Sequence, residues 1–255
     1  MLKTRLFFII SIFLSVLCSN NAQSQDWKQE AIEYERIIFE DSGENINACL
    51  FGKAECLKQD GQYAEALATL SRVRSYLLSE DEVQELLYQQ ELCAFLSNNF
   101  SEAASYISML NRWDKTTVSL HSLVLAANGQ FRESLEMASL IDGIDPEGIE
   151  RLKAEIPKEK DSQSAMIMSF LPPLGHLYTG NTNEGVLSMS MNLLCAGWMV
   201  SQIVTGNYIG GFLGGSIGLS YTYMGNFERT DFLVQKYNNN SRAEFCGKLQ
   251  KLING

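Results

Sequence analysis

The chain has few of the residues on which protein chemistry most often depends. It holds only two histidines and four prolines in 255 residues. It contains no HExxH motif, GxSxG elbow, phosphate-binding loop or dinucleotide fingerprint, and no CxxC pair that would support a zinc or thioredoxin-like site. We expect His121 to be a packed or surface residue of a helix, and the His176 side chain to bond exposed backbone. The sequence therefore predicts a protein that is not an enzyme and has no cofactor, metal or catalytic residue.

Positive charge is also scarce. The chain has 20 Lys and Arg against 30 Asp and Glu, which gives a net charge of −10. Nucleic acid and anionic lipid surfaces both need basic partners, so this balance argues against nucleic-acid binding and against electrostatic attachment to a membrane. Any membrane attachment is expected to come from apolar burial.

Charge is absent altogether between Gly185 and Phe227. The stretch divides into two apolar runs, Gly185–Val204 and Tyr208–Gly225, joined by the turn Thr205–Asn207. As a helix, each run of about 20 residues is long enough to cross a hydrocarbon core of about 30 Å. The pattern predicts a membrane-embedded helical hairpin, with a shallowly inserted or buried soluble hairpin as the alternative. The lack of charge argues against a proton relay or ion pathway.

The N-terminus has the layout of a secretory signal. Met1–Arg5 carries two positive charges, Leu6–Leu17 is an apolar run, and Ser19–Ala22 ends in a small residue. We predict a signal peptide over residues 1–22, cleaved after Ala22, so that the mature chain begins outside the cytoplasm. Lipidation at Cys18 is the alternative, although Leu17 stands where a lipobox has a small residue. Of the remaining cysteines, Cys56 could meet Cys93 from a neighbouring helix, and otherwise we expect small buried residues.

Three segments of the N-terminal half share one pattern. In each, an apolar helix runs into a residue that tolerates a left-handed C-cap: Gly61, Asn98 or Gly129. An aromatic residue follows two positions later and a small residue three positions after that. The small residue lets two helices approach closely, and the aromatic side chain fills the space beside it. The members of these two sets are Tyr63, Phe100 and Phe131, and Ala66, Ala103 and Ser134.

These segments resemble the tetratricopeptide repeat, with its Gly-x-Tyr-x-x-Ala core, over residues 26–141. The resemblance is degenerate, because Leu50, Leu87 and Val118 stand where the family has a large aromatic, and its proline between repeats is missing. It implies an all-α array of helical pairs with a groove that binds a partner protein or peptide. Residues 142–164 are rich in charge, and we predict a linker helix between Pro146 and Pro157.

A second resemblance covers residues 165–240. Pro172, Gly175, Tyr178 and Gly180 precede the charge-free stretch, and Gly225-Asn226 and Tyr237-Asn238 follow it. This arrangement is similar to small bacterial two-transmembrane-helix domains with a Pro-Gly-x-Gly-x-x-Tyr-x-Gly-like motif, although Pro173 and His176 replace the usual Gly and Gln. We predict a turn at Asn238–Ser241 and a short C-terminal helix within residues 241–255.

Glycines recur every four residues in the second apolar run. The main row is Gly206, Gly210, Gly214 and Gly218, and Gly211 and Gly215 add a second row. Small residues at this spacing let helices pack closely in lipid. The first run is the expected partner, and another copy of the chain is the alternative. Asn192 and Gln202 are expected to hydrogen-bond across the hairpin.

Together these features predict an all-α protein in which a tetratricopeptide-like array is followed by a membrane hairpin. The predicted function is an extracytoplasmic scaffold or adaptor held in the inner membrane, with the array in the periplasm and an unidentified protein or peptide partner. The alternatives are a homo-oligomeric channel or transport component built from the glycine-rich hairpin, and a secreted or periplasmic soluble protein. The positive-inside rule favours the opposite orientation, so the topology rests on the signal.

Overall fold

The computed structural model describes residues 26–40 and 45–255, and within these ranges the chain is helical, with no strand. The prediction of an all-α protein with helices packed in pairs is confirmed. The chain forms two compact units, one up to Ile149, which we call the array, and one from Glu150, which we call the hairpin unit. The predicted signal peptide, Cys18 included, lies outside the described residues.

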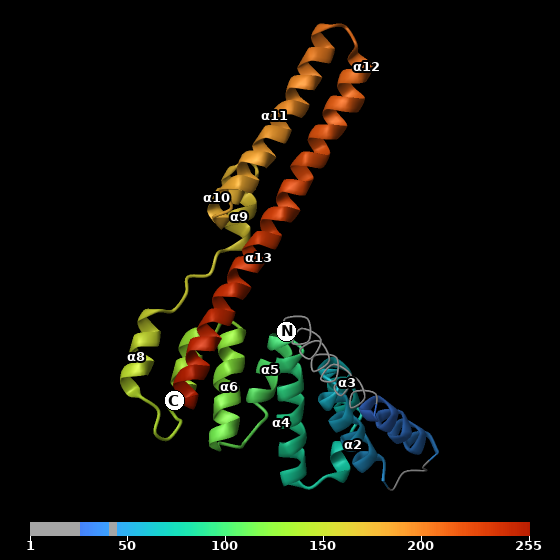
Figure 1. The fold of residues 1–255 in the computed structure, drawn as a ribbon, viewed down its shortest axis with the longest axis vertical. Helices are drawn as coiled ribbons and strands as arrows, with labels where there is room; N and C mark the ends of the chain where they lie inside the picture. Colours follow the sequence, from blue (N-terminus) through green and yellow to red (C-terminus); the bar gives the residue numbers. More distant parts are fainter. Residues whose placement is uncertain (1–25, 41–44) are drawn as a thin grey trace, which may run out of the picture. The chain divides into compact units, whose positions relative to one another are not determined.

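The array consists of helical pairs that follow one another along the chain (Figure 1). A helix over residues 26–40 precedes them, and a 3₁₀ turn, η1, lies at Ser75–Leu77. Neighbouring pairs also pack, α3 on α4 and α5 on α6. The pairs are α2 (Ile46–Gln59) with α3 (Tyr63–Leu70), α4 (Glu80–Leu96) with α5 (Phe100–Ile107), and α6 (Lys115–Ala127) with α7 (Phe131–Ala138).

In two of the helical pairs, a side-chain cap fixes where the first helix begins. Ser79 and Glu82 form a capping box at α4, in which each side chain bonds the backbone N–H of the other residue. At α6 the Asp114 carboxylate accepts hydrogen bonds from the N–H groups of Thr116 and Thr117 at 2.9 and 3.1 Å. The polar residues before these helices therefore set the register of their apolar faces.

The same left-handed connection joins the two helices of every pair. Gly61, Asn98 and Gly129 have φ values of 77°, 62° and 84°. The N–H of the next residue then bonds the carbonyl five positions back, as in Gln62 to Leu57 at 2.8 Å. This is the hydrogen bond of a Schellman motif. The connection reverses the chain in very few residues, which places the second helix against the first.

The hairpin unit continues from α8 (Pro146–Ala154), which crosses the boundary between the units and occupies the predicted linker region. Residues 155–161 are not helical. Two short helices, α9 (Ser162–Ser169) and α10 (Leu174–Thr179), then lead into the hairpin, whose first arm is α11 (Thr182–Val204). The second arm comprises α12 (Tyr208–Gly210), the π-helix η2 (Gly211–Ser216) and α13 (Ile217–Asn254), and it packs along α11 (Figure 1).

The second arm is one unbroken helix, because the residues at both junctions keep right-handed helical backbone angles. The π segment coincides with three glycines, Gly211, Gly214 and Gly215, where no Cβ resists the wider turn. The predicted turn at Asn238–Ser241 is wrong, since α13 passes through it without a break. An Asn side chain can end a helix by bonding nearby backbone groups. The Asn238 side chain instead bonds the backbone N–H and carbonyl of Lys160, at 2.8 and 2.9 Å.

The left-handed connection of the array recurs twice in the hairpin unit. Gly180, between α10 and α11, has φ 83°, and Gly206, between α11 and α12, has φ 79°. The N–H groups of Asn181 and Asn207 bond carbonyls five residues back, both at 2.9 Å. In all five connections, the residue five positions after the left-handed one is small and buried. These residues are Ala66, Ala103, Ser134, Gly185 and Gly211.

Candidate functional site

The Pro/Gly segment forms a corner at the base of the hairpin. Asp161 caps α9 by accepting a hydrogen bond from the Ser164 N–H at 2.7 Å. The chain then passes through Pro172 and Pro173, which are joined by a cis peptide bond, into the six-residue α10. Gly180 ends α10 in the left-handed region and turns the chain into α11.

Gly175 marks the closest approach of α10 to its neighbours. A Cβ at this position would lie 2.0 Å from the Ser169 Oγ and 3.0 Å from the Thr230 Oγ1, so no side chain fits. Ser169 and Thr230 are fully buried and donate their hydroxyl hydrogens to carbonyls of their own helices, both at 2.8 Å. The glycine of the predicted motif therefore lets α9, α10 and α13 meet.

Asn226 connects three helices from its position on α13, where it is 3% exposed. Its Nδ2 donates to the Ser169 carbonyl on α9 at 2.9 Å, and its Oδ1 accepts from the Ser188 hydroxyl on α11 at 3.0 Å. A buried amide with both ends paired holds its helices in one register. Gly225, its predicted companion, is exposed, and a Cβ there would meet nothing within 4 Å.

A second polar contact crosses the hairpin one helical turn further along. The Thr222 hydroxyl on α13 donates to the Asn192 Oδ1 on α11 at 2.8 Å, as expected for Asn192. Gln202 differs from the prediction, because its Oε1 accepts from Asn207 Nδ2 at 2.7 Å within the turn. The Asn207 Oδ1 in turn caps the second arm by accepting from the Gly210 N–H at 3.0 Å.

Lys160 joins the two ends of the motif, a role that its place in the sequence does not reveal. Its ammonium donates to the Tyr178 carbonyl at 2.7 Å and lies 4.0 Å from the centre of the Tyr237 ring. Burial lowers the pKa of the Lys160 amine. Tyr178, predicted as an interface residue, accepts the Asp161 N–H at 3.1 Å with its hydroxyl. Tyr178 and Tyr237 flank the charge-free stretch in the sequence, and this pattern could have predicted that both contact one residue, here Lys160.

The two glycine rows of the second arm lie differently against the first run. A Cβ at Gly215 would lie 2.4 Å from the Met199 Cβ, and one at Gly211 would lie 3.3 Å from the Gln202 Cβ. The second row is therefore the line of closest approach to α11. In the main row, Gly206 is the turn residue and Gly210 meets only its own cap, Asn207, while Gly214 and Gly218 face the side chains of Trp198 and Cys195.

A groove of about 340 Å³ opens within the hairpin unit beside the Pro/Gly corner. Its buried end includes His176, which is 2% exposed and whose Nδ1 has no hydrogen-bond partner in the described structure, so this atom bonds no backbone group. Burial lowers the pKa of the imidazole below its usual 6.5. Its exposed end includes the pair Arg229 and Glu184, joined across α13 and α11 by two hydrogen bonds of 2.7 and 2.8 Å.

The hairpin presents its large apolar side chains to the outside. Most are more than half exposed on both arms, with Leu194 at 69% and Ile209 at 74%. Among the described helices, α11 alone is long and apolar enough to cross a membrane, and none of its apolar window is buried. The exposed set is Val186, Leu187, Leu193, Leu194, Trp198, Val200, Val204, Tyr208, Ile209, Phe212, Leu213, Tyr221 and Met224.

The repeat-packing residues of the array lie at the interfaces of the pairs. Ala66, Ala103 and Ser134 are fully buried, and the Ser134 hydroxyl donates to the Ser122 carbonyl of the paired helix at 2.7 Å. Of the aromatic residues that follow each turn, Phe131 is buried, whereas Tyr63 and Phe100 are half-buried. Each left-handed residue, Gly61 among them, lies at the turn itself.

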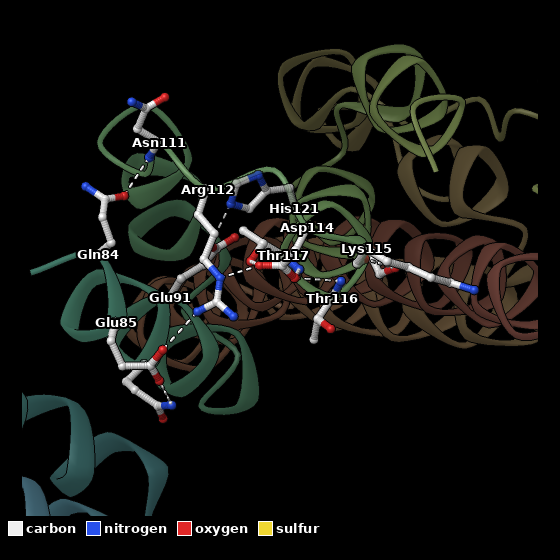
Figure 2. Close-up of polar contacts among 12 residues, drawn as sticks. Gln84, Glu85, Glu91, Asn111, Arg112, Asp114, Lys115, Thr116, Thr117 and His121 are labelled. Carbon is white, nitrogen blue, oxygen red and sulfur yellow. Dashed lines mark hydrogen bonds and ion pairs between the residues drawn. The ribbon is translucent and has the colours of Figure 1, made fainter. Parts of the chain in front are cut away.

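A polar cluster lies between α4 and α6 in the array (Figure 2). His121 is fully buried, and its Nε2 lies 3.0 Å from the Oε2 of the equally buried Glu91. Burial raises the pKa of Glu91, while the hydrogen bond to His121 and its charge act in the opposite direction. Trp113 packs edge-on against the His121 ring, with centroids 6.4 Å apart. The pair is enclosed, so it offers no site to a ligand.

The outer part of this cluster is centred on Arg112 (Figure 2). Arg112 pairs with Asp114, the cap of α6, and with Glu85 on α4 at 2.9 Å. The Asn111 N–H donates to the Gln84 Oε1 at 2.7 Å. Side-chain and backbone hydrogen bonds hold the pKa of Asp114 at about 2, against the raising effect of burial. These contacts attach the loop before α6 to α4 and have no evident chemical role.

Cys56 and Cys93, which the sequence suggested could meet, are free thiols. Burial raises the pKa of the Cys93 thiol to about 11, so it is a poor nucleophile at neutral pH. In the part of the chain that the structure describes, no group of three or more His, Cys, Asp or Glu side chains could hold a metal ion.

Comparisons with known proteins give no relative to reason from, because no family model, curated protein or solved structure matches the chain. The class that the structure defines is an all-helical protein with an array of helical pairs and a helical hairpin.

Proposed function

We propose that the protein is a membrane-anchored adaptor, in which the hairpin inserts into a bilayer and the array binds a partner protein or peptide. The observation that supports the anchor best is the outward apolar surface of both hairpin arms along a stretch without charge. Exposed apolar patches of this extent are rare on soluble monomers and mark interaction or membrane surfaces. The cost of leaving them in water is removed when they face hydrocarbon.

The interior of the hairpin suits the same environment. Backbone groups in a helix bond one another, so they need no water inside a bilayer. The polar side chains Ser188, Asn192, Thr222 and Asn226 are paired between or along the arms, which lowers their cost in lipid. Gly211 and Gly215 let the arms approach closely, as packing without a hydrophobic driving force requires.

The adaptor role of the array rests on its architecture. Stacked helical pairs form extended surfaces that commonly bind peptides or proteins, which is an argument from the fold alone. The chain has more acidic than basic residues, so a basic partner segment is favoured over an acidic one. We place the array outside the cytoplasm, on the basis of the signal-like N-terminus.

The anchor is tested by carbonate extraction of membranes that carry the full-length protein. We expect the wild type to stay in the membrane pellet, and Leu194→Arg to move substantially to the supernatant. Leu194 is 69% exposed near the middle of the apolar run, where an arginine costs about 3 kcal/mol in a membrane helix. The control is Leu140→Arg, at a residue of the array that is 61% exposed.

Release of the wild type by carbonate, or equal retention of both variants, would show that the hairpin is not the anchor. The partner is sought separately, by crosslinking in intact membranes with the full-length chain. A partner captured by the wild type and by an array variant with a broken turn, Gly61→Val, in equal amounts would contradict a role for the array.

A further inference from the structure

The groove in the hairpin unit has charged side chains at one end and apolar side chains further along, as a phospholipid has a charged headgroup followed by apolar chains. We propose that it binds a zwitterionic glycerophospholipid with a primary amine in its headgroup. The inference rests on the proposed insertion of the hairpin in a bilayer. It concerns one lipid held at a defined place, which anchoring by itself does not require.

The position of the groove along the hairpin matches the depth of lipid headgroups. Glu184 is the last charged residue before the charge-free stretch, and Glu228 and Arg229 are the first after it. The Arg229–Glu184 pair therefore lies where the hydrocarbon ends on both arms, at the level of headgroups. Leu187 and Met191 line the groove further along α11, inside the charge-free stretch, where an acyl chain would lie.

The charges at the exposed end suit a headgroup with both signs. Arg229 and Glu184 are 46% and 38% exposed, so each has donor or acceptor capacity left on its solvent side. A guanidinium binds phosphate oxygens with two parallel hydrogen bonds, and a carboxylate accepts from an ammonium group. A phosphoethanolamine headgroup supplies both partners at once. An anionic headgroup would satisfy Arg229 and leave Glu184 beside a like charge.

The buried end has one polar atom without a partner. Ser188, Thr222 and Asn226 also line the groove, but they hydrogen-bond within the hairpin. His176 is 2% exposed, and its Nδ1 is unpaired among the described residues. Because Nδ1 has almost no accessible surface, it makes no hydrogen bond to a molecule in the groove, and His176 forms part of the groove wall.

Native mass spectrometry of the full-length protein in detergent tests the site, after incubation with dioleoyl phosphatidylethanolamine or dioleoyl phosphatidylglycerol. We expect the wild type to keep one phosphatidylethanolamine molecule, and Arg229→Gln and Glu184→Gln to lose it by about tenfold, as removal of one charged hydrogen-bond partner predicts. The matched control is Arg242→Gln. Arg242 lies on α13, as Arg229 does, but outside the groove, and it forms a similar two-bond pair with Glu159.

A second pair of variants leaves the ion pair intact. Leu187→Trp should fill the groove and remove the adduct, while Leu193→Trp, on the same helix but outside the groove, should keep it. Equal adducts in wild type, Arg229→Gln and Leu187→Trp would overturn the site, and retention of phosphatidylglycerol as strong as that of phosphatidylethanolamine would overturn the headgroup. Carbonate extraction of membranes that carry the same variants separates the two proposals, because a protein that stays in membranes but binds no defined lipid contradicts this inference alone.

Discussion

Glu91 and His121 form the most deeply buried charged pair among the described residues of the array. Neither side chain reaches solvent, and Glu91 Oε1 and His121 Nδ1 have no hydrogen-bond partner in the described structure. A buried pair of this kind contributes little net stability, yet loss of one partner leaves the other uncompensated. The sequence showed a histidine on a helix, but its carboxylate partner lies 30 positions earlier, so only the packing of α4 on α6 reveals the pair.

A double-mutant cycle at this pair follows from that cost. We expect Glu91→Leu and His121→Leu each to destabilise the array by about 3 kcal/mol, and the double variant to lose clearly less than the sum. Urea unfolding followed by fluorescence measures this, with Trp113 beside His121 as the local reporter. Additive losses in the double variant would mean that the two side chains are energetically independent.

A second residue-scale prediction concerns pH. Glu35, in the helix at residues 26–40, accepts two hydrogen bonds from Arg72 and one from Lys53, which lower its pKa from 4.5 to about 2. A carboxyl group with a lowered folded-state pKa stabilises fully above its unfolded pKa, and the gain is lost as the pH falls toward the folded value. Because the Glu35 side chain is 43% exposed, solvent screening limits the gain to about 1 kcal/mol or less.

Hydrogen exchange of residues 26–40 between about pH 5 and about pH 3 should therefore show a loss of protection in the wild type. In Glu35→Gln the protection should already be low at the upper pH and change less. A variant that follows the wild-type pH profile would assign the effect to other carboxylates.

At the scale of helices, the sequence predicted the elements well where local rules decide. The glycine or asparagine at each repeat turn has a left-handed backbone, and the apolar run from Gly185 ends at Val204 as α11 does. Two features depend on distant partners and were missed. The break at Asn238–Ser241 does not occur because Lys160 takes up the Asn238 side chain, and the closest glycine row is set by Met199 on the opposite arm.

The close glycine row gives a prediction for the hairpin. A Cβ at Gly215 would clash with Met199, so Gly215→Ala should weaken the pairing of the two arms by about 1–3 kcal/mol. Gly225→Ala, on the same arm with open space around it, is the control and should have little effect. Thermal unfolding of the full-length protein in detergent compares the two, and equal melting temperatures would contradict the observed line of approach.

At the scale of the whole molecule, charge and apolar surface both favour the proposed attachment by apolar burial. The net charge of −10 disfavours anionic lipid surfaces, while the hairpin exposes apolar side chains on both arms. Composition alone leads to the same proposal. The boundary between the two units, at Ile149 and Glu150, falls inside the linker predicted at residues 142–164, whereas the groove could not be predicted because it depends on contacts between residues far apart in the chain.

This mode predicts that ionic strength does not control membrane association. A wash in about 1 M NaCl, where the Debye length is about 3 Å, should leave the protein in the pellet, while detergent should release it. A fractionation series with a peripheral, electrostatically bound protein as control measures this. Release by salt alone would imply attachment through charge.

The unbroken second arm has a geometric consequence. From Tyr208 to Asn254 the helix is about 70 Å long at 1.5 Å per residue, more than twice the thickness of a hydrocarbon core of about 30 Å. With its charge-free part in the bilayer, roughly 40 Å of the same helix must extend into water. In the proposed insertion, the same helix serves both as anchor and as rigid stalk, and it carries the C-terminus to a fixed height above the membrane surface.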